Sequence, residues 1–181
     1  MKKNISLFLL AFIFIVNANA QKGVHLIAKG GLNYSKIADN DFNASYHAGA
    51  SLEIDFSKVV GLQPEILFSQ LNNKGTNGNK DDKLNYLSIP LLLRINVSKM
   101  FTINVGPEYS ILMNKNEKFL GNIQNAFKEG NFSMIGGVQL NLQSFRAYAR
   151  YDVGLSNLNN TITPKEWKSQ NLQVGVGIKI F

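Results

Sequence analysis

Apolar and polar residues alternate with a period of two through most of this chain, and the alternation is clearest from Gly61 to Val97. Ile66 and Phe68 fall on one face of this stretch, whereas Glu65 falls on the other. A period of two indicates β-strands, because successive side chains leave opposite faces of a pleated backbone.

The predicted strand from Leu84 to Val97 has 14 residues, whereas a strand in a soluble sheet typically has about 5–6. At ~3.3 Å per residue it extends roughly 46 Å, and at a tilt of ~45° it rises roughly 33 Å. That rise exceeds the ~25 Å apolar band of a transmembrane barrel. The length therefore favours a strand that crosses a membrane.

The same alternation continues to the end of the chain and predicts eight strands. They cover residues 24–36, 45–57, 61–71, 84–97, 101–114, 131–143, 145–157 and 172–181. Long polar connections at 37–44, 72–83, 115–130 and 158–171 alternate with short ones near Lys58, Ser98 and Ser144. Short turns on one rim and long loops on the other are typical of an outer-membrane barrel. We therefore predict an all-β fold, an eight-stranded antiparallel up-and-down transmembrane β-barrel with both termini in the periplasm.

The first twenty residues are predicted to be a cleaved signal peptide that precedes the fold. Residues 2–3 are basic, residues 5–16 are almost wholly apolar, and residues 18–20 supply a small-x-small cleavage pattern. The apolar run of about a dozen residues is shorter than the ~20 that a membrane-spanning helix needs. We expect cleavage after Ala20, which leaves residues 21–181 as one exported outer-membrane barrel domain.

The composition excludes several classes of protein and site. The chain has no cysteine, so it forms neither a disulfide scaffold nor a thiolate metal site. Its formal net charge of +7 falls to +5 when Lys2 and Lys3 are removed (7 − 2). This mild excess comes without an arginine-rich helix or a base-stacking motif, so we expect no nucleic-acid partner. We also expect no cofactor.

The polar faces of the predicted strands carry ten charged residues, which we expect to form a charge network in the lumen. The basic members are Lys29, Arg94, Arg146, Arg150 and Lys179, and the acidic members are Glu53, Asp55, Glu65, Glu108 and Asp152. The interior of an eight-stranded barrel is just wide enough for side chains to fill, and a buried unpaired charge is costly. The charges are therefore predicted to pair and to plug the lumen, with Arg94 bridging Glu65 and Glu108. An ion path or a proton relay is the competing interpretation.

The two histidines do not predict a metal site or a catalytic site. His25 and His47 lie near opposite strand ends, which disfavours a shared metal ion. Ser45 and Asp39 or Asp41 could be drawn with the second histidine as a triad, but isolated residues of these types in a polar loop region are usually solvated. We therefore expect no catalytic residue and no metal ligand.

Glycines lie inside several predicted strands, where glycine normally weakens pairing. They are Gly30, Gly31, Gly49, Gly106, Gly136, Gly137, Gly154, Gly175 and Gly177. In a small barrel such positions permit sharp coiling of the strands. They also make room for large side chains opposite.

Two motifs resemble a known family of membrane barrels. LQPEILFSQ (62–70) and KLNYLSIPLLLR (83–94) are similar to the patterns LQPELLYSQ and LNYLxIPLLLK of the PorT-like outer-membrane β-barrel proteins of Bacteroidetes. Further similar segments are KGGLNYS (29–35), VGPEYSILM (105–113), ARYDVGLSNL (149–158) and LQVGVGIKI (172–180). The resemblance implies an outer-membrane barrel with a link to secretion and gliding machinery. The terminal Phe181 also resembles the C-terminal aromatic residue that barrel-insertion machinery reads.

These observations predict a non-enzymatic outer-membrane protein, structural or engaged in surface interactions, with a plugged lumen and four surface loops. Its expected partners are outer-membrane lipid, lipopolysaccharide and, during insertion, the barrel-assembly machinery; the partner of the loops is left open. A soluble eight-stranded ligand-binding barrel of the lipocalin type competes with this prediction, because the alternation by itself does not say which face is inside. Two less favoured functions are a small pore and an outer-membrane lipid-modifying enzyme, which would need a His/Ser/Asp cluster at the loop rim.

Overall fold

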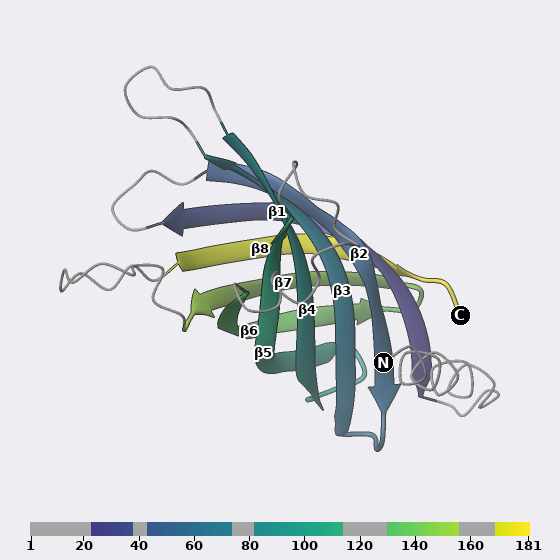
Figure 1. Cartoon of the computed structure of the whole chain (residues 1–181). Coiled ribbons are helices and arrows are strands. Elements are labelled where there is room, and N and C mark those ends of the chain that lie inside the picture. The colour runs from purple at the N-terminus through teal and green to yellow at the C-terminus, as the bar shows by residue number, and fades with distance from the viewer. Residues whose placement is uncertain (1–22, 38–42, 74–81, 114–129, 156–168) are drawn as a thin grey trace, which may run out of the picture.

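The computed structural model describes residues 23–37, 43–73, 82–113, 130–155 and 169–181, which form one closed sheet (Figure 1). The predicted signal peptide and most of each long connection lie outside these residues. Among the described residues, no helix is long and apolar enough to cross a membrane. The regular structure that the described part of the chain contains is all β.

Eight strands follow one another along the chain, as the alternation predicts. They are β1 (Val24–Ile37), β2 (Asn43–Asp55), β3 (Val60–Asn73), β4 (Asp82–Asn96), β5 (Phe101–Met113), β6 (Asn131–Leu142), β7 (Phe145–Gly154) and β8 (Ser169–Lys179). The ladder between β3 and β4 continues to the pair Asn73 and Asp82, further into the connection than the alternation indicates. Backbone hydrogen bonds hold a ladder together whatever the side chains are, so polar strand ends pair as well.

Each strand pairs antiparallel with the next, and β8 pairs with β1, so the sheet closes into a barrel (Figure 1). Following register partners once around the wall from Val24 leads to Tyr34, a shift of 10 residues (34 − 24). The path passes through Ile54, Leu62, Leu93, Val105, Gly136, Tyr151 and Leu172. Such a shift over about 8 strands spaced ~4.8 Å apart corresponds to a tilt of roughly 40° and a backbone radius of roughly 8 Å. The predicted eight-stranded antiparallel barrel is confirmed.

The two ends of the barrel differ in their connections. Short turns at residues 56–59, 97–100 and 143–144 join strands at the end where β1 begins and β8 ends; we call this the turn end and the opposite end the loop end. Ser57 and Ser98 cap two of the turns, because each Oγ accepts hydrogen bonds from the backbone N–H groups two and three residues ahead. In an outer-membrane barrel the short turns face the periplasm.

The apolar face of the strands points outward and the polar face points inward. Ile66 and Val176 on the outer wall are 60% and 61% exposed, whereas Glu53 and Gln139 are each 1% exposed. A soluble lipocalin-type barrel needs the opposite arrangement, with apolar side chains lining its cavity. A closed barrel with an apolar outer wall satisfies its backbone internally and suits contact with lipid. The structure therefore excludes the soluble lipocalin-type barrel.

Two glycines of the wall make room for large side chains in the lumen. A Cβ added at Gly31 would collide with the Val174 carbonyl oxygen of β8 and would also lie 2.8 Å from His47 Cε1, and one added at Gly175 would collide with the Tyr148 hydroxyl. Interiors are packed too closely to absorb such overlaps without moving neighbouring atoms. The two glycines therefore let His47 and Tyr148 occupy the interior of the barrel.

Candidate functional site

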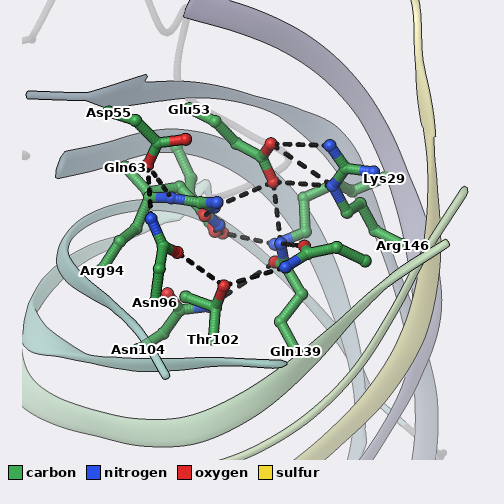
Figure 2. A network of polar contacts seen from close by, with 12 residues as sticks. Lys29, Glu53, Asp55, Gln63, Arg94, Asn96, Thr102, Asn104, Gln139 and Arg146 are labelled. Atoms are coloured by element: carbon green, nitrogen blue, oxygen red, sulfur yellow. Dashed lines mark hydrogen bonds and ion pairs between the residues drawn. The ribbon is translucent and has the colours of Figure 1, made fainter. Parts of the chain in front are cut away.

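The lumen is the candidate site, and its charges form layers of which the one nearer the turn end is centred on Glu53 (Figure 2). Arg146 donates to the Glu53 carboxylate from both Nε and Nη2, each at 3.0 Å. Arg94 Nη1 lies 2.9 Å from Glu53 Oε1, and Arg94 Nε lies 3.1 Å from Asp55 Oδ1. In this turn-end layer two guanidinium groups therefore neutralise two carboxylates.

Amide side chains complete the turn-end layer (Figure 2). Gln63 Oε1 accepts a hydrogen bond from Arg94 Nη1 at 2.5 Å, and Gln139 Nε2 donates to Glu53 Oε1 at 2.7 Å. Buried ion pairs offset their desolvation only when additional hydrogen bonds satisfy the remaining polar atoms. The two glutamines supply such bonds from β3 and β6, so the layer is tied to strands that carry none of its charges.

Glu65 holds a second layer, the central layer, between two cations. Lys29 Nζ lies 2.7 Å from Glu65 Oε1, and Arg150 Nη1 lies 2.7 Å from Glu65 Oε2. The three side chains are 2%, 0% and 3% exposed, in the order lysine, glutamate, arginine. Gln63 Nε2 donates to Glu65 Oε1 at 2.6 Å and so connects this layer to the turn-end layer.

Every ion pair within the described residues joins strands that are not neighbours in the sheet. Glu53 on β2 pairs with Arg146 on β7, and Glu65 on β3 pairs with Arg150 on β7. Since β3 and β7 are four strands apart in a closed ring of eight, their pair spans the full width of the lumen. The ion pairs therefore cross the interior and do not follow the wall.

Tyr148 contacts both cations of the central layer. Lys29 Nζ lies 4.1 Å and Arg150 Cζ lies 5.2 Å from the centre of its ring, within the range of a cation–π interaction. Its hydroxyl lies 2.7 Å from His47 Nε2, and His47 Nδ1 lies 2.7 Å from Asn33 Oδ1. The amide oxygen accepts the Nδ1 proton, which leaves Nε2 of a neutral imidazole to accept from the tyrosine O–H.

These contacts do not support the catalytic triad considered for His47. Asn33 and Tyr148 occupy its two ring nitrogens, and Ser45 Oγ has no hydrogen-bond partner among the described residues. The two aspartates considered with it lie outside the described residues. In the part of the chain that the structure describes, no group of three or more His, Cys, Asp or Glu side chains is placed to hold a metal ion.

Glu108 and Asp152 lie on the loop-end side of the central layer. Ser110 donates to Glu108 Oε1 at 2.7 Å, and the Ser88 and Ser110 hydroxyls are 2.8 Å apart. Ser133 hydrogen-bonds to Asp152. Within the described ranges neither carboxylate makes an ion pair, and Glu108 Oε2 and Asp152 Oδ1 have no hydrogen-bond partner.

The structure places seven of the ten charges selected from the sequence in ion pairs. They are Lys29, Glu53, Asp55, Glu65, Arg94, Arg146 and Arg150. Glu108 and Asp152 lie in the lumen without one. Lys179 is half-buried near the turn end of β8 and makes no ion pair to any described residue.

The predicted bridge from Arg94 to Glu65 and Glu108 is wrong. Register places Arg94 opposite Gly61 on β3, four residues from Glu65 (65 − 61). On its other side Arg94 lies opposite Asn104, four residues from Glu108 (108 − 104). Four residues of strand measure roughly 13 Å, which is beyond the reach of an ion pair. The arginine is level with the carboxylates of β2 instead.

Four residues of the lumen network are uncharged and are not among the site residues predicted from the sequence. They are Asn33, Gln63, Gln139 and Tyr148. All of them fall on the polar face of their strands in the alternation. This position indicates that their side chains point into the lumen, where every inward side chain of a narrow barrel meets others. It is the feature of the sequence from which these four residues can be predicted.

Comparisons with known proteins agree with this geometry. Residues 6–179 match the family described as the outer membrane protein beta-barrel domain. The solved structure of Ail, the attachment invasion locus protein of Yersinia pestis, is 12% identical with a TM-score of 0.51, and the match covers 87% of this chain and 98% of that one. The structure of Neisserial surface protein A (NspA) is 12% identical with a TM-score of 0.53, covering 87% of this chain and 97% of that one. No curated protein sequence matches the chain.

The solved structures share the fold, and the family match spans nearly the whole sequence. A closed eight-stranded barrel with an apolar outer wall is the form in which outer-membrane proteins cross the bilayer. The protein is located in the outer membrane, as predicted from the sequence. The chain belongs to the outer membrane protein β-barrel domain family.

Proposed function

We propose that this protein is a non-enzymatic outer-membrane barrel whose own side chains close its lumen, so that its function is carried by surface interactions of its loops. The observation that carries the proposal is the ion pair between Arg150 and Glu65, which joins opposite walls at 2.7 Å. Lys29 holds the same carboxylate from a third strand. An ion moving along the barrel axis would have to separate these buried charges.

The turn-end layer supports the same proposal, because it adds a second obstacle in series. Arg146 crosses from β7 to Glu53 on β2, and Arg94 reaches the same carboxylate from β4. A backbone radius of roughly 8 Å leaves an interior that side chains fill. A path for ions would therefore require two networks of buried charges to open together.

Conductance in planar bilayers tests the plug. The wild-type protein, shown to be folded by its resistance to SDS before boiling, should give no sustained current. The double variant Glu53→Gln, Glu65→Gln removes the central acceptor of both layers and should leak if it folds. A steady ion-selective current through the wild type would overturn the plug and favour the small pore.

The surface role rests on the fold and on what related barrels are named for. Ail is named for attachment and invasion, and NspA is named as a surface protein. We extend the proposal to contact with lipopolysaccharide at the outer wall and to insertion by the barrel-assembly machinery. Cross-linking from tags in the loops on intact cells, compared with cross-linking from the periplasmic turns, tests the surface role of the loops. Recovery of partners from the turns alone would count against a role for the loops.

The motifs of β3 and β4 support a narrower version, in which the protein is PorT-like and its partner belongs to secretion machinery. LQPEILFSQ and KLNYLSIPLLLR are the residues on which this version rests. A strain that lacks the protein should then secrete its substrates poorly, and re-expression should restore secretion. Normal secretion in the deletion strain would remove the narrower proposal and leave the broader one standing.

A further inference from the structure

Two carboxylates of the lumen lie at nearly the same height on the loop-end side of the central layer. The register partner of Glu108 is Ser133 on β6, whose partner on β7 is Gly154, and Asp152 lies two residues nearer the turn end. The register shifts by 10 residues over 8 strands, so each register partner on the next strand lies nearer the loop end. The rise per strand equals about 1.25 residues of strand. From β5 to β7 this rise nearly cancels the two-residue offset between Asp152 and Gly154. Glu108 and Asp152 therefore differ in height by only about 1 Å along the barrel axis.

Among the described residues, this carboxylate pair differs from the other buried carboxylates in having no cation of its own. Glu53 and Glu65 each contact two cationic side chains. Glu108 is 3% exposed, and its Oε2 is buried without a hydrogen-bond partner. Asp152 Oδ1 is likewise buried without a partner. Unmatched polar atoms of this kind cost free energy unless something outside the described chain meets them.

The charge of the described lumen shows the same deficit. In the central layer and the carboxylate pair taken together, the cations Lys29 and Arg150 face the carboxylates Glu65, Glu108 and Asp152. Two positive charges face three negative ones, which leaves one negative charge (2 − 3). The turn-end layer is neutral, so the deficit falls on the central layer and the carboxylate pair. The half-buried Lys179 lies at the other end of the barrel.

The charged and titratable groups that face the pair from the surrounding strands do not remove the deficit. Arg150 on β7 interacts electrostatically with both carboxylates. Its Nη1 contacts Glu65 and its Nε contacts Gln173, while its Nη2 is buried without a hydrogen-bond partner among the described residues. Lys29 on β1 is also paired with Glu65, and both ring nitrogens of His47 on β2 are hydrogen-bonded, to Asn33 and Tyr148. Among the described residues, the carboxylate pair therefore shares an arginine that another carboxylate already holds.

We propose that Glu108 and Asp152 bind a small hard cation in the loop-end half of the lumen. Their unmatched oxygens are the ligand type that Ca²⁺, Mg²⁺ and similar ions prefer. The Ser110 and Ser133 hydroxyls already hold the other carboxylate oxygens and so orient the pair. A bound divalent cation would join β5 to β7 across β6 and would neutralise the two negative charges of the carboxylate pair. The proposal is independent of whether the loops bind a partner.

Thermal unfolding of the folded barrel in a zwitterionic detergent, followed by its mobility on unboiled gels, tests the site. Protein treated with EDTA would be titrated with CaCl₂ or MgCl₂ at constant ionic strength. Binding to the folded state alone raises the unfolding midpoint in a saturable way. We expect this rise in the wild type and its loss in Glu108→Gln and in Asp152→Asn. Equal rises in the wild type and both variants would show unspecific binding and overturn the proposal.

A second comparison covers the case in which a variant changes stability for other reasons. Without divalent cations, Glu108→Gln removes one of two neighbouring negative charges and should leave the unfolding midpoint equal to or above that of the wild type. The control Glu65→Gln breaks two ion pairs and should lower it. An equal loss in both variants would contradict the charge deficit. A wild type that is stabilised by lower pH but not by cations would show that a proton occupies the pair, and would overturn the cation site.

Discussion

Replacing Glu65 with glutamine should weaken the barrel strongly, because this one carboxylate neutralises two buried cations. Lys29 Nζ and Arg150 Nη1 each lie 2.7 Å from it, and its own side chain is 0% exposed. Glutamine keeps the size of the side chain and one acceptor oxygen but removes the charge. The change therefore isolates the electrostatic contribution from that of packing.

The expected loss in the free energy of unfolding depends on the two cations that stay buried when the Glu65 charge is removed. Removing one partner of a buried ion pair typically costs ~3–5 kcal/mol, because the other charge stays buried and uncompensated. Here two cations lose their nearest carboxylate, and the charge of Lys29, Glu65 and Arg150 together rises from +1 to +2. Water drawn to the uncompensated charges would lower this penalty. We therefore expect a loss near ~3–5 kcal/mol rather than twice that amount.

The loss can be measured by urea titration of the barrel in lipid vesicles, with the folded fraction read from unboiled gels. Ser51→Ala is the matched control, because Ser51 is also buried and its Oγ has no hydrogen-bond partner among the described residues. Removing an unmatched hydroxyl should be nearly neutral. Adding Lys29→Met to Glu65→Gln should recover part of the loss. A loss below about 1 kcal/mol for Glu65→Gln would refute the reasoning, because it would mean that Lys29 and Arg150 do not depend on the Glu65 carboxylate for compensation of their buried charges.

Three further changes test the wall, the packing of the lumen and the orientation. Leu91→Arg, on an outer wall where Leu91 is 47% exposed, should cost roughly 2–4 kcal/mol and lower the folded yield; the same stability as Leu91→Phe would contradict a lipid-facing position. Gly175→Ala should cost roughly 1–3 kcal/mol, because its Cβ would overlap the Tyr148 ring and the Gly30 carbonyl oxygen. The control Gly136→Ala, whose Cβ would meet no atom within 4 Å, should leave the urea midpoint nearly unchanged, and equal midpoints for the two variants would contradict the close packing at Gly175. A tag inserted at Asn77 should be labelled on intact cells and one at Lys58 only after lysis, whereas the reverse pattern would overturn the orientation.

The fold could be predicted from the sequence because two of its causes are local. The alternation of Ile66 and Phe68 with Glu65 fixes which side chains share a face, and this needs no knowledge of distant residues. The alternation of short and long connections then fixes an antiparallel order with all the short turns at one end. What alternation leaves open is which face is inside. The closed structure decides that, with Ile66 exposed on the wall and Glu65 buried in the lumen.

The partners inside the lumen could not be predicted, because register is not a local property. Moving one strand past its neighbour by two residues keeps every side chain on the same face. The same shift moves a side chain by roughly 6.6 Å along the strand, which is enough to exchange one ion-pair partner for another. Arg94 shows the consequence, because the sequence predicts contacts with Glu65 and Glu108 whereas the side chain contacts Glu53 and Asp55. The packing of His47 beside Gly31 likewise depends on the register between β1 and β2, in which the two residues are partners.

The same ambiguity gives the buried charges a physical role in folding. A two-residue slip between strands leaves the apolar outer wall intact, so contact with lipid alone discriminates weakly against it. In the lumen, such a slip would pull Arg146 away from Glu53 and Arg150 away from Glu65, pairs that now lie at 3.0 and 2.7 Å. Each broken pair would leave a buried charge at a cost of ~3–5 kcal/mol. An apolar interior of equal volume would tolerate the slip far better, so the ion pairs that close the lumen also select the register in which it closes.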